Sequence, residues 1–341
     1  MRKYLLPKDG TFYKANLHCH STVSDGKLTP EELKKAYTDK GYSIIAYTDH
    51  DVLIDQQHLT DDKFLALNGY EMEINEQSAK AFYAKKTCHM CLVALKPDNL
   101  TMVCHHRSNK YIFANAVNYA DRIKFDESAP DFERHYTPEC ISEMMKMGID
   151  NGFFVTYNHP GWSMETYEQY SKYENMHAME ICNYGCVVEG YTDYNEKEYD
   201  QILQTGKRIY CIATDDNHNR HELDSKRCDS FGGFTMIKAD RLEYETITDA
   251  LLSGNFYASQ APEIHELWFE DGKIFIKCSE AYSVTVNTGR RSTYIKFAEN
   301  GEKLTEASFE IKPEDIYVRI TVTDKNGLHA NTNAYFTDEL F

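Results

Sequence analysis

The chain has 341 residues, a formal net charge of −17, 42% hydrophobic and 27% charged residues, which is typical of a soluble globular protein. Its length suits one large domain and a smaller one. The negative charge disfavours long nucleic acid as a partner, because a phosphate backbone needs a basic surface, and the sequence lacks the apolar run of about 18 residues that a membrane span requires.

Residues 1–8 contain too short an apolar run for a signal peptide, so we expect a cytoplasmic protein. The ten cysteines are scattered singly, which favours reduced thiols over a disulfide framework. Segments 88–91 and 182–186 could each supply half of a structural zinc site. Neither is accompanied by a second Cys/His pair at the usual spacing, so buried thiols are the better interpretation.

The first predicted strand ends at a His-Cys-His sequence. In an extended segment, residues two apart point to the same side, so His18 and His20 can face one point while Cys19 faces away. Asp25 follows in a Ser-Asp-Gly turn that can direct its carboxylate to the same place. Two imidazoles and a carboxylate suit a divalent metal, although two ordinary structural histidines are the alternative. Because Cys19 points away, it is a poor candidate for a nucleophile.

A helix and a second strand follow this segment. Residues 29–41 have the sequence of a capped helix, with Thr-Pro-Glu-Glu at the start and glycine at the end. Residues 42–48 form a predicted buried strand, and Asp-His-Asp at 49–51 lies at its carboxyl end. Polar groups at the carboxyl ends of strands are where α/β barrels carry their active sites.

The same arrangement recurs along the chain. Further strands are predicted over 64–70, 89–95, 153–158, 179–183, 208–213 and 234–239, with helices over 137–145, 194–203 and 245–253. Polar candidates follow three of these strands, namely Glu71, His159, and the pair Asp216 and His218. His89 begins its strand, which the barrel rule does not explain. The alternation predicts a mostly parallel sheet with helices outside, closed as a barrel.

Two segments depart from this pattern. An insertion over about 98–138 is polar, aromatic and basic, and is either a lid over a site or a surface excursion. Beyond residue 262, alternating strands and an Asp-Gly turn predict an antiparallel β domain of sandwich type. We therefore expect a catalytic barrel over 1–262 and a structural or oligomerising β domain over 263–341.

These motifs resemble those of the polymerase-and-histidinol-phosphatase (PHP) superfamily over about residues 12–262. The matching segments, which occur in the family's order, are 17–26, 47–51, 69–71, 158–161 and 216–218. The resemblance implies a distorted (β/α)7 barrel with two or three divalent ions, Zn, Mn or Fe, at its mouth. Segments 231–235 and 255–262, with the β tail, are similar to the carbaryl-hydrolase-like branch of metallohydrolases.

The resemblance also implies a complete ligand set. The first metal would be held by His18, His20, Glu71 and Asp216; the second by Glu71, His89 and His159; the third by Asp25, His50 and His218. Among these, Glu71, Asp216 and His218 are the predicted catalytic residues.

Some positions keep an alternative. His105 or His106 could replace His89 if the insertion folds inward. The acidic neighbours of the motifs either orient imidazoles or are turn and cap residues; they are Asp49, Asp51 and Asp215.

Closely spaced metal ions lower the pKa of a shared water, and the resulting hydroxide can attack phosphorus or a carbonyl carbon. We therefore predict a phosphoesterase acting on a small phosphorylated metabolite or nucleotide. A carbamate, ester or amide hydrolase and a non-catalytic metal-binding module are the alternatives. The candidates for binding a phosphate, otherwise surface charges, are Arg107, Arg220, His221 and Arg227.

Overall fold

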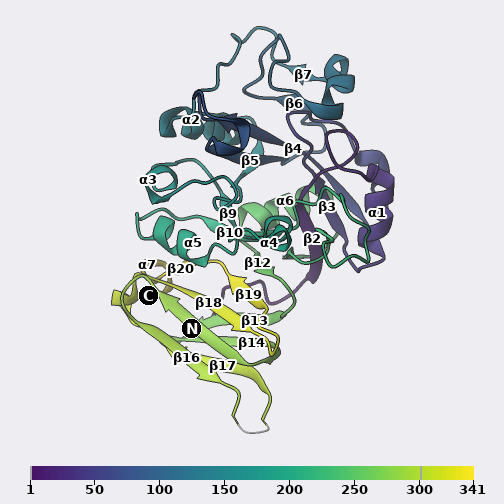
Figure 1. The fold of residues 1–341 in the computed structure, drawn as a ribbon. Helices are drawn as coiled ribbons and strands as arrows, with labels where there is room; N and C mark the ends of the chain where they lie inside the picture. Colours follow the sequence, from purple (N-terminus) through teal and green to yellow (C-terminus); the bar gives the residue numbers. More distant parts are fainter. Residues whose placement is uncertain (1, 300–301) are drawn as a thin grey trace.

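The computed structural model describes residues 2–299 and 302–341 (Figure 1). Its largest sheet has the strand order β10-β9-β8-β5-β4-β3-β2-β11-β12-β19-β18-β15-β16, and β20 pairs with β18. The strands of this sheet are β2 (Thr11–Cys19), β3 (Ile44–Tyr47), β4 (Leu65–Asn75), β5 (Thr87–Ala94), β8 (Phe153–Tyr157), β9 (Ala178–Asn183), β10 (Tyr210–Thr214), β11 (Phe234–Ala239), β12 (Phe256–Ser259), β15 (Ser283–Thr288), β16 (Thr293–Phe297), β18 (Tyr317–Thr323), β19 (His329–Thr332) and β20 (Tyr335–Phe336).

The remaining elements are short or lie outside this sheet. A second sheet contains β1 (Lys3–Tyr4), β13 (Ile264–Glu270), β14 (Lys273–Ala281) and β17 (Leu304–Glu310), and β6 (Thr101–Met102) pairs with β7 (Lys124–Phe125). The α-helices are α1 (Pro30–Thr38), α2 (Pro138–Asp150), α3 (Tyr167–Tyr170), α4 (Tyr184–Glu189), α5 (Glu196–Leu203), α6 (Tyr244–Leu252) and α7 (Thr337–Leu340). The 3-10 helices are η1 (Gln57–Leu59), η2 (Phe82–Ala84), η3 (Ala114–Arg122) and η4 (Pro313–Asp315).

Helix α1 forms where its sequence predicts it. The hydroxyl of Thr29 accepts a hydrogen bond from the Glu32 amide at 3.2 Å, and the Glu32 carboxylate accepts one from the Thr29 amide at 2.8 Å. This capping box satisfies amides that have no partner inside the helix. Leu33 and Tyr37 form its buried face, so the helix covers the β2–β3 part of the sheet.

The large sheet is mixed rather than mostly parallel. Strands β2, β3 and β4 are parallel, and so are β8, β9 and β10, but β5 is antiparallel to both β4 and β8. The reason is the connection over 76–86, which is a hairpin without an α-helix and therefore reverses the chain. The described residues thus form a mixed α/β fold without the regular strand–helix alternation expected from the sequence.

This reversal explains the position of His89. Because β5 runs against β4, the start of β5 lies beside the end of β4, and His89 is paired with Glu73. His89 is thereby brought to the same end of the sheet as the residues that follow β2, β3 and β4.

The two ends of this part of the sheet meet at the candidate site. Strand β10 is an edge of the sheet in the pairing order, yet the Asp216 amide donates to the His18 carbonyl at 2.9 Å and the His20 amide to the Asn217 carbonyl at 3.2 Å. The segment after β10 therefore lies against the end of β2, which closes the sheet on itself at its functional end.

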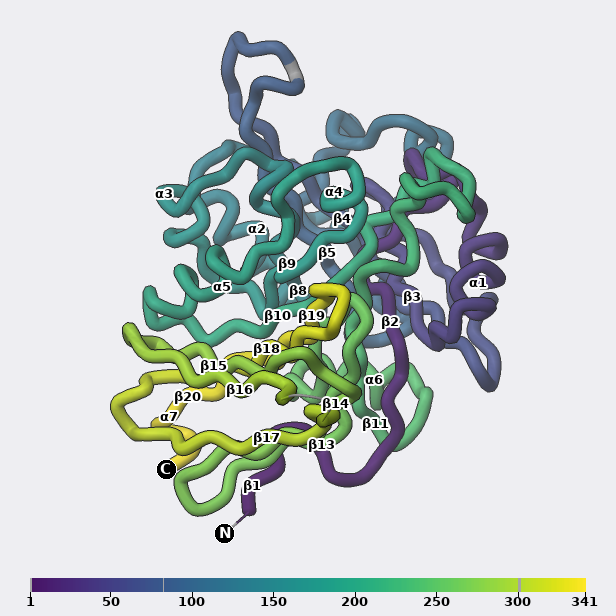
Figure 2. The backbone as a smooth tube through the Cα atoms, turned by 60° about the horizontal axis from the view of Figure 1, so that its bottom comes forward, coloured from purple at the N-terminus to yellow at the C-terminus, as the bar shows by residue number. Residues whose placement is uncertain are grey.

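The C-terminal strands extend the same sheet. Strand β19 pairs with β12, and β18, β15 and β16 continue from it. The N-terminal β1 pairs with β13, so both termini lie beside the C-terminal strands (Figure 2). The division of the chain at residue 262 stays a prediction.

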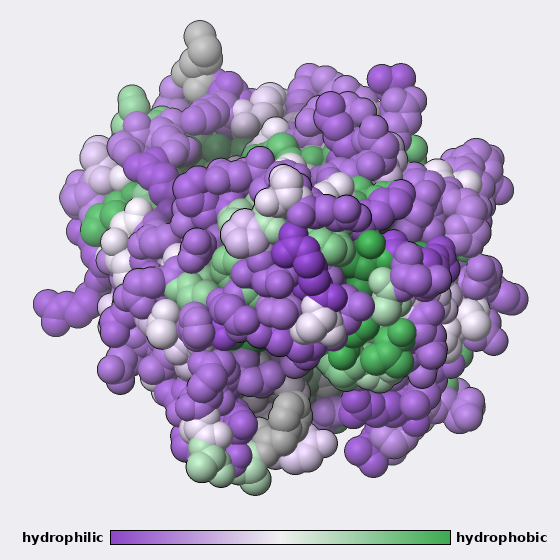
Figure 3. All heavy atoms as spheres, turned by 90° about the horizontal axis from the view of Figure 1, so that it is seen from above, coloured by the Kyte–Doolittle hydropathy of each residue, from purple (hydrophilic) through white to green (hydrophobic). Residues whose placement is uncertain are grey.

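The outer surface agrees with the charge of the chain. Seen from above Figure 1, it is mostly hydrophilic, with hydrophobic atoms gathered in smaller patches (Figure 3). Within the described residues, every helix is too short or too polar to cross a membrane.

Candidate metal centre

The alternation of side chains in β2 divides the strand between core and site. His18 and His20 point into the site, whereas Cys19 packs with Leu33 and Tyr37 of α1. Burial raises the pKa of the Cys19 thiol well above its ordinary value. The expectation that Cys19 points away from the histidines is therefore confirmed.

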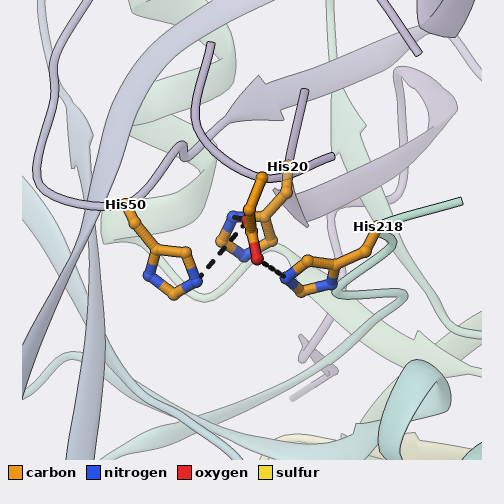
Figure 4. Close-up of side chains that lie close together, drawn as sticks. His20, His50 and His218 are labelled. Carbon is orange, nitrogen blue, oxygen red and sulfur yellow. Dashed lines mark ion pairs between the residues drawn. The ribbon is translucent and has the colours of Figure 1, made fainter. Parts of the chain in front are cut away.

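One group of potential ligands contains His20, Asp25, His50 and His218. Each offers an atom within 4.8 Å of the others. Figure 4 shows the three imidazoles turned toward a common point. An Asp25 oxygen lies 3.3 Å from Nε2 of His218 and another lies 3.8 Å from Nδ1 of His20. This is the donor set of a divalent metal site.

The carboxylate of Glu71 lies at the centre of the remaining ligands. Its Oε1 is 3.2 Å from Nε2 of His18, 3.1 Å from Nδ1 of His89 and 3.3 Å from Nε2 of His159. Its Oε2 is 3.1 Å from Nδ1 of His50. A carboxylate whose two oxygens face different histidines is suited to bridge two metal ions.

Asp216 completes the cluster. Its Oδ1 lies 3.2 Å from Nε2 of His18 and 3.0 Å from Nε2 of His20, and its Oδ2 lies 3.8 Å from Nε2 of His159. The fold therefore brings together all nine ligand positions that the sequence suggests, although His20 lies in the same group as Asp25, His50 and His218.

The cluster leaves buried polar atoms without hydrogen bonds, which tests whether metal ions fit. Within residues 2–299 and 302–341, the unpaired atoms include Nδ1 of His20, Nδ1 of His50, Oε2 of Glu71 and Oδ1 of Asp216. An unpaired buried polar atom costs about 1–3 kcal/mol. Imidazole and carboxylate lone pairs directed into one space are what a divalent cation would satisfy, so the residues fit such ions.

The pKa values of the buried histidines depend strongly on the neighbouring charges of the cluster. Burial lowers the pKa of His20, but the carboxylates of Asp216 and Glu71 outweigh burial and raise that pKa well above its ordinary value. Burial and the neighbouring His20 hold the pKa of His50 well below its ordinary value. Histidines with opposite shifts in one small space indicate a site where charge is concentrated.

A buried carboxylate that the sequence analysis missed orients the ring of His18 and holds the backbone of His159. Glu180, in β9, lies 2.7 Å from Nδ1 of His18 and accepts a hydrogen bond from the His159 amide at 2.9 Å. Carboxylates that hold a ligand's second nitrogen fix the orientation of the ring. The only indication in the sequence is an acidic residue inside an otherwise apolar strand.

The acidic neighbours of the motifs hold loops in place. Asp49 accepts hydrogen bonds from the amides of Ser21 and Ser24 at 2.8 and 3.1 Å, and thereby fixes the turn that carries Asp25. Asp215 similarly accepts from amides of the loop over 231–233. Burial raises the pKa of Asp215 to about 7. Asp49 and Asp215 are therefore turn and cap residues, which is one of the two alternatives considered for them from the sequence.

A cavity of about 430 Å³ opens over the cluster. Arg220 lines it, 3.5 Å from Asp25, and so does Lys85, a cation that the sequence analysis missed. Phe113, Trp162 and Tyr191 supply aromatic walls. Because Lys85 lies on an irregular hairpin, no pattern in the sequence distinguishes it from surface lysines.

The other candidate cations lie elsewhere. Arg107 pairs with Asp131 at 3.0 Å within the insertion, and His221 and Arg227 are absent from the described lining of the cavity. The two histidines that could replace His89 also stay within the insertion, where His105 contacts Phe125 and His106 pairs with Glu133.

Comparisons with known proteins give short or distant similarities. No family model matches the chain. A segment of 40 residues, 12% of this chain, is 48% identical to a 5'-3' exoribonuclease of Haemophilus influenzae, and it spans 15% of that protein.

Three solved structures are similar in fold. A two-domain protein from Bacteroides vulgatus, described as containing a predicted PHP-like metal-dependent phosphoesterase, is 14% identical with a TM-score of 0.45, covering 98% of this chain and 97% of that one. A putative metal-dependent phosphoesterase from Bifidobacterium adolescentis is 13% identical (TM-score 0.37, 64% and 91% covered). An amidohydrolase from Chromobacterium violaceum, with bound sulfate and no metal, is 12% identical (TM-score 0.36, 60% and 87% covered). Likenesses this distant assign neither a family nor an activity to the chain.

Proposed function

We propose that the protein is a metal-dependent phosphoesterase that hydrolyses a small phosphorylated metabolite or nucleotide. The observation that carries this proposal is the convergence of nine histidine and carboxylate side chains, seven of which line one cavity, with buried ligand atoms that make no hydrogen bond within the described residues. A structural role for the histidines does not account for such atoms, because buried polar groups in proteins are normally paired.

The chain's own residues would perform distinct tasks. His20, Asp25, His50 and His218 would hold one divalent ion. The others would be held by His18, Glu71, His89, His159 and Asp216. When bound, such ions supply a water of lowered pKa and stabilise the negative charge that develops during hydrolysis. The identity of the ions, Zn, Mn or Fe, depends on supply as much as on these ligands.

Two cations are suited to bind the substrate. Arg220 and Lys85 both line the cavity. They would contact phosphate oxygens, while the aromatic walls around Trp162 would contact the organic part of the substrate. Glu180 would keep the His18 ring in its orientation throughout.

We also propose that β2–β5 and β8–β11 are a distorted form of the PHP barrel. The proposal is supported by the backbone hydrogen bonds between the ends of β2 and β10, with the Asp216 amide 2.9 Å from the His18 carbonyl. The antiparallel β5 and the missing crossover helix are the distortion.

The decisive experiment compares the chelated and the reconstituted protein. Bound metal is counted by elemental analysis, and phosphate release from a panel of phosphomonoesters is measured before and after adding Mn²⁺, Zn²⁺ or Fe²⁺. We expect hydrolysis to disappear on chelation, to return with metal, and to be absent from a His18→Ala, His20→Ala double variant. Undiminished hydrolysis by metal-free protein would contradict the proposal.

The same assay separates the alternatives. Cleavage of aryl carbamates, esters or amides without phosphate release would identify a carbonyl hydrolase. Tight metal binding without turnover of either class would identify a non-catalytic metal-binding module.

A further inference from the structure

The insertion over 98–138 sends one charged side chain into the interior. Arg134 and Asp51 form a bidentate ion pair, with distances of 2.9 and 2.5 Å, and their side chains are 3% and 2% exposed. The Arg134 guanidinium also donates to the carbonyl of Glu73 at 2.7 Å and lies 4.0 Å from the centre of the Tyr111 ring. It therefore connects the insertion, the turn after β3 and the end of β4.

The turn that Arg134 holds carries His50. Asp51 has a φ of 49°, a left-handed conformation that a residue other than glycine keeps only with support from its surroundings. Its amide donates to the Glu71 carbonyl at 2.8 Å, and its carboxylate is fixed by Arg134. The backbone on the carboxyl side of His50 is thus held from two directions.

The insertion also contacts the His50 ring itself. Phe113 lies with its ring centre 4.9 Å from that of His50, and the Asn115 amide donates to the Ser24 carbonyl at 2.9 Å, next to Asp25. The insertion is therefore a fixed wall of the site, and its contacts concentrate on the group formed by His20, Asp25, His50 and His218.

Stability alone is a weak explanation for this ion pair. Removing two charges from water costs several kcal/mol per ion, so a buried pair is often no more stabilising than apolar residues of the same volume. What a bidentate guanidinium–carboxylate pair provides is a fixed relative orientation.

We infer that Arg134 is a positioning residue that, through Asp51, sets the geometry of His50 and so completes the metal group of His20, Asp25, His50 and His218. This inference rests on the proposed function, since it concerns the same metal centre. Arg134 acts on one metal group and leaves the ligands around Asp216 in place.

The test is a double variant, Asp51→Asn with Arg134→Met, which removes both charges and leaves no unpaired buried ion. Metal content and Zn²⁺ affinity are measured by titration, and the Co²⁺-loaded protein is examined by absorption spectroscopy. We expect one class of sites to weaken by about 10- to 100-fold, the usual cost of losing a group that orients a ligand. The other sites should keep their wild-type affinity.

A second buried pair provides the matched control. Arg319, in β18, donates two hydrogen bonds of 2.8 Å to Asp200 of α5. An Arg319→Met, Asp200→Asn variant should fold and bind every metal ion as the wild type does. Arg134→Lys, which keeps the charge without the second hydrogen bond, should show an intermediate metal affinity and serves if the double variant does not fold.

The outcomes separate this inference from the proposed function. Wild-type metal affinity at every site in the folded Asp51→Asn, Arg134→Met variant, or in Arg134→Lys, would overturn the role of Arg134 alone. A wild-type protein that binds no divalent ion would overturn the proposed function and this inference with it.

Discussion

In the C-terminal part of the chain, the buried charged side chains of Asp315 and Arg319 have partly exposed partners of opposite charge. At the end of the sheet that carries the cluster, several buried polar atoms have no hydrogen-bond partner among the described residues. Asp315 is fully buried and accepts hydrogen bonds from Nε of Arg290 at 2.6 Å and from the Lys312 amide at 2.8 Å. By contrast, Oε2 of Glu71 and Oδ1 of Asp216 are buried and make no hydrogen bond, although histidine nitrogens lie 3.1 and 3.0 Å from them.

The difference shows which part of the molecule is complete by itself. A paired buried charge has its desolvation cost offset by its partner, but an unpaired one raises the free energy of the folded chain. A group of unpaired ligand atoms persists in a fold when something else binds there. The proposed metal ions would satisfy the ligand atoms of the cluster around Glu71.

The largest effect on activity and metal content is expected when the central carboxylate, Glu71, is removed. Glu71→Gln keeps the shape of the side chain but takes away the charge that faces five histidines. Because a divalent ion stabilises the reaction by several kcal/mol, we expect hydrolysis to fall by on the order of 1,000-fold and the metal content to drop. Phosphate release and elemental analysis measure the two effects, and circular dichroism checks the fold. Normal turnover at a reduced metal content would show that hydrolysis does not depend on the metal ions held by Glu71.

A substitution in the C-terminal strands should lower the stability of the fold without affecting the metal centre. Arg319→Met leaves Asp200 and Glu196 without their buried partner, which costs about 3–5 kcal/mol in a fully buried pair and less here because both carboxylates are partly exposed. Urea unfolding should show this loss, while the metal content per folded molecule stays at the wild-type value. A loss of metal in this variant would mean that the two regions are coupled.

A smaller effect is expected at the two cations of the cavity. Lys85→Ala and Arg220→Ala should each raise KM by roughly tenfold, the equivalent of one partly solvated charge-assisted hydrogen bond, and leave kcat less affected. The increase should shrink at high salt, because exposed charges are screened. Arg241→Ala removes an exposed arginine paired with Glu243 at 3.1 Å and is the matched control, with an unchanged KM. Equal KM values in all three variants would exclude both cations from substrate binding.

The parts of this fold that the sequence predicts are those determined by neighbouring residues. The helix predicted over 29–41 is found at Pro30–Thr38 because its cap, its proline and its buried face are all local. The positions of His18, His50 and Asp216 at strand ends follow from short apolar runs that stop at polar residues.

What the sequence does not predict depends on partners far away in the chain. The direction of β5 is decided by the hairpin over 76–86 and by pairing with β8, and neither is visible in the apolar sequence of the strand. Arg134 contacts Asp51 across 83 positions, and Glu180 meets His18 across 162. A charged residue that becomes buried by such a contact looks like any surface residue until the fold is known.

The smallest effect is expected at Cys19, between two ligands of the cluster. Its thiol packs against α1, and burial raises its pKa well above the ordinary value, so the thiolate that a nucleophile requires is scarce at neutral pH. Cys19→Ala should therefore retain wild-type kcat and metal content and lose only about 1 kcal/mol of stability. Iodoacetamide should leave Cys19 unmodified in the native protein and react first at the half-buried Cys140, as peptide mass spectrometry can determine. If alkylation of Cys19 inactivates the protein, or if a folded Cys19→Ala variant is inactive, the metal-centred mechanism is wrong. Those outcomes would instead support nucleophilic attack by the Cys19 thiol.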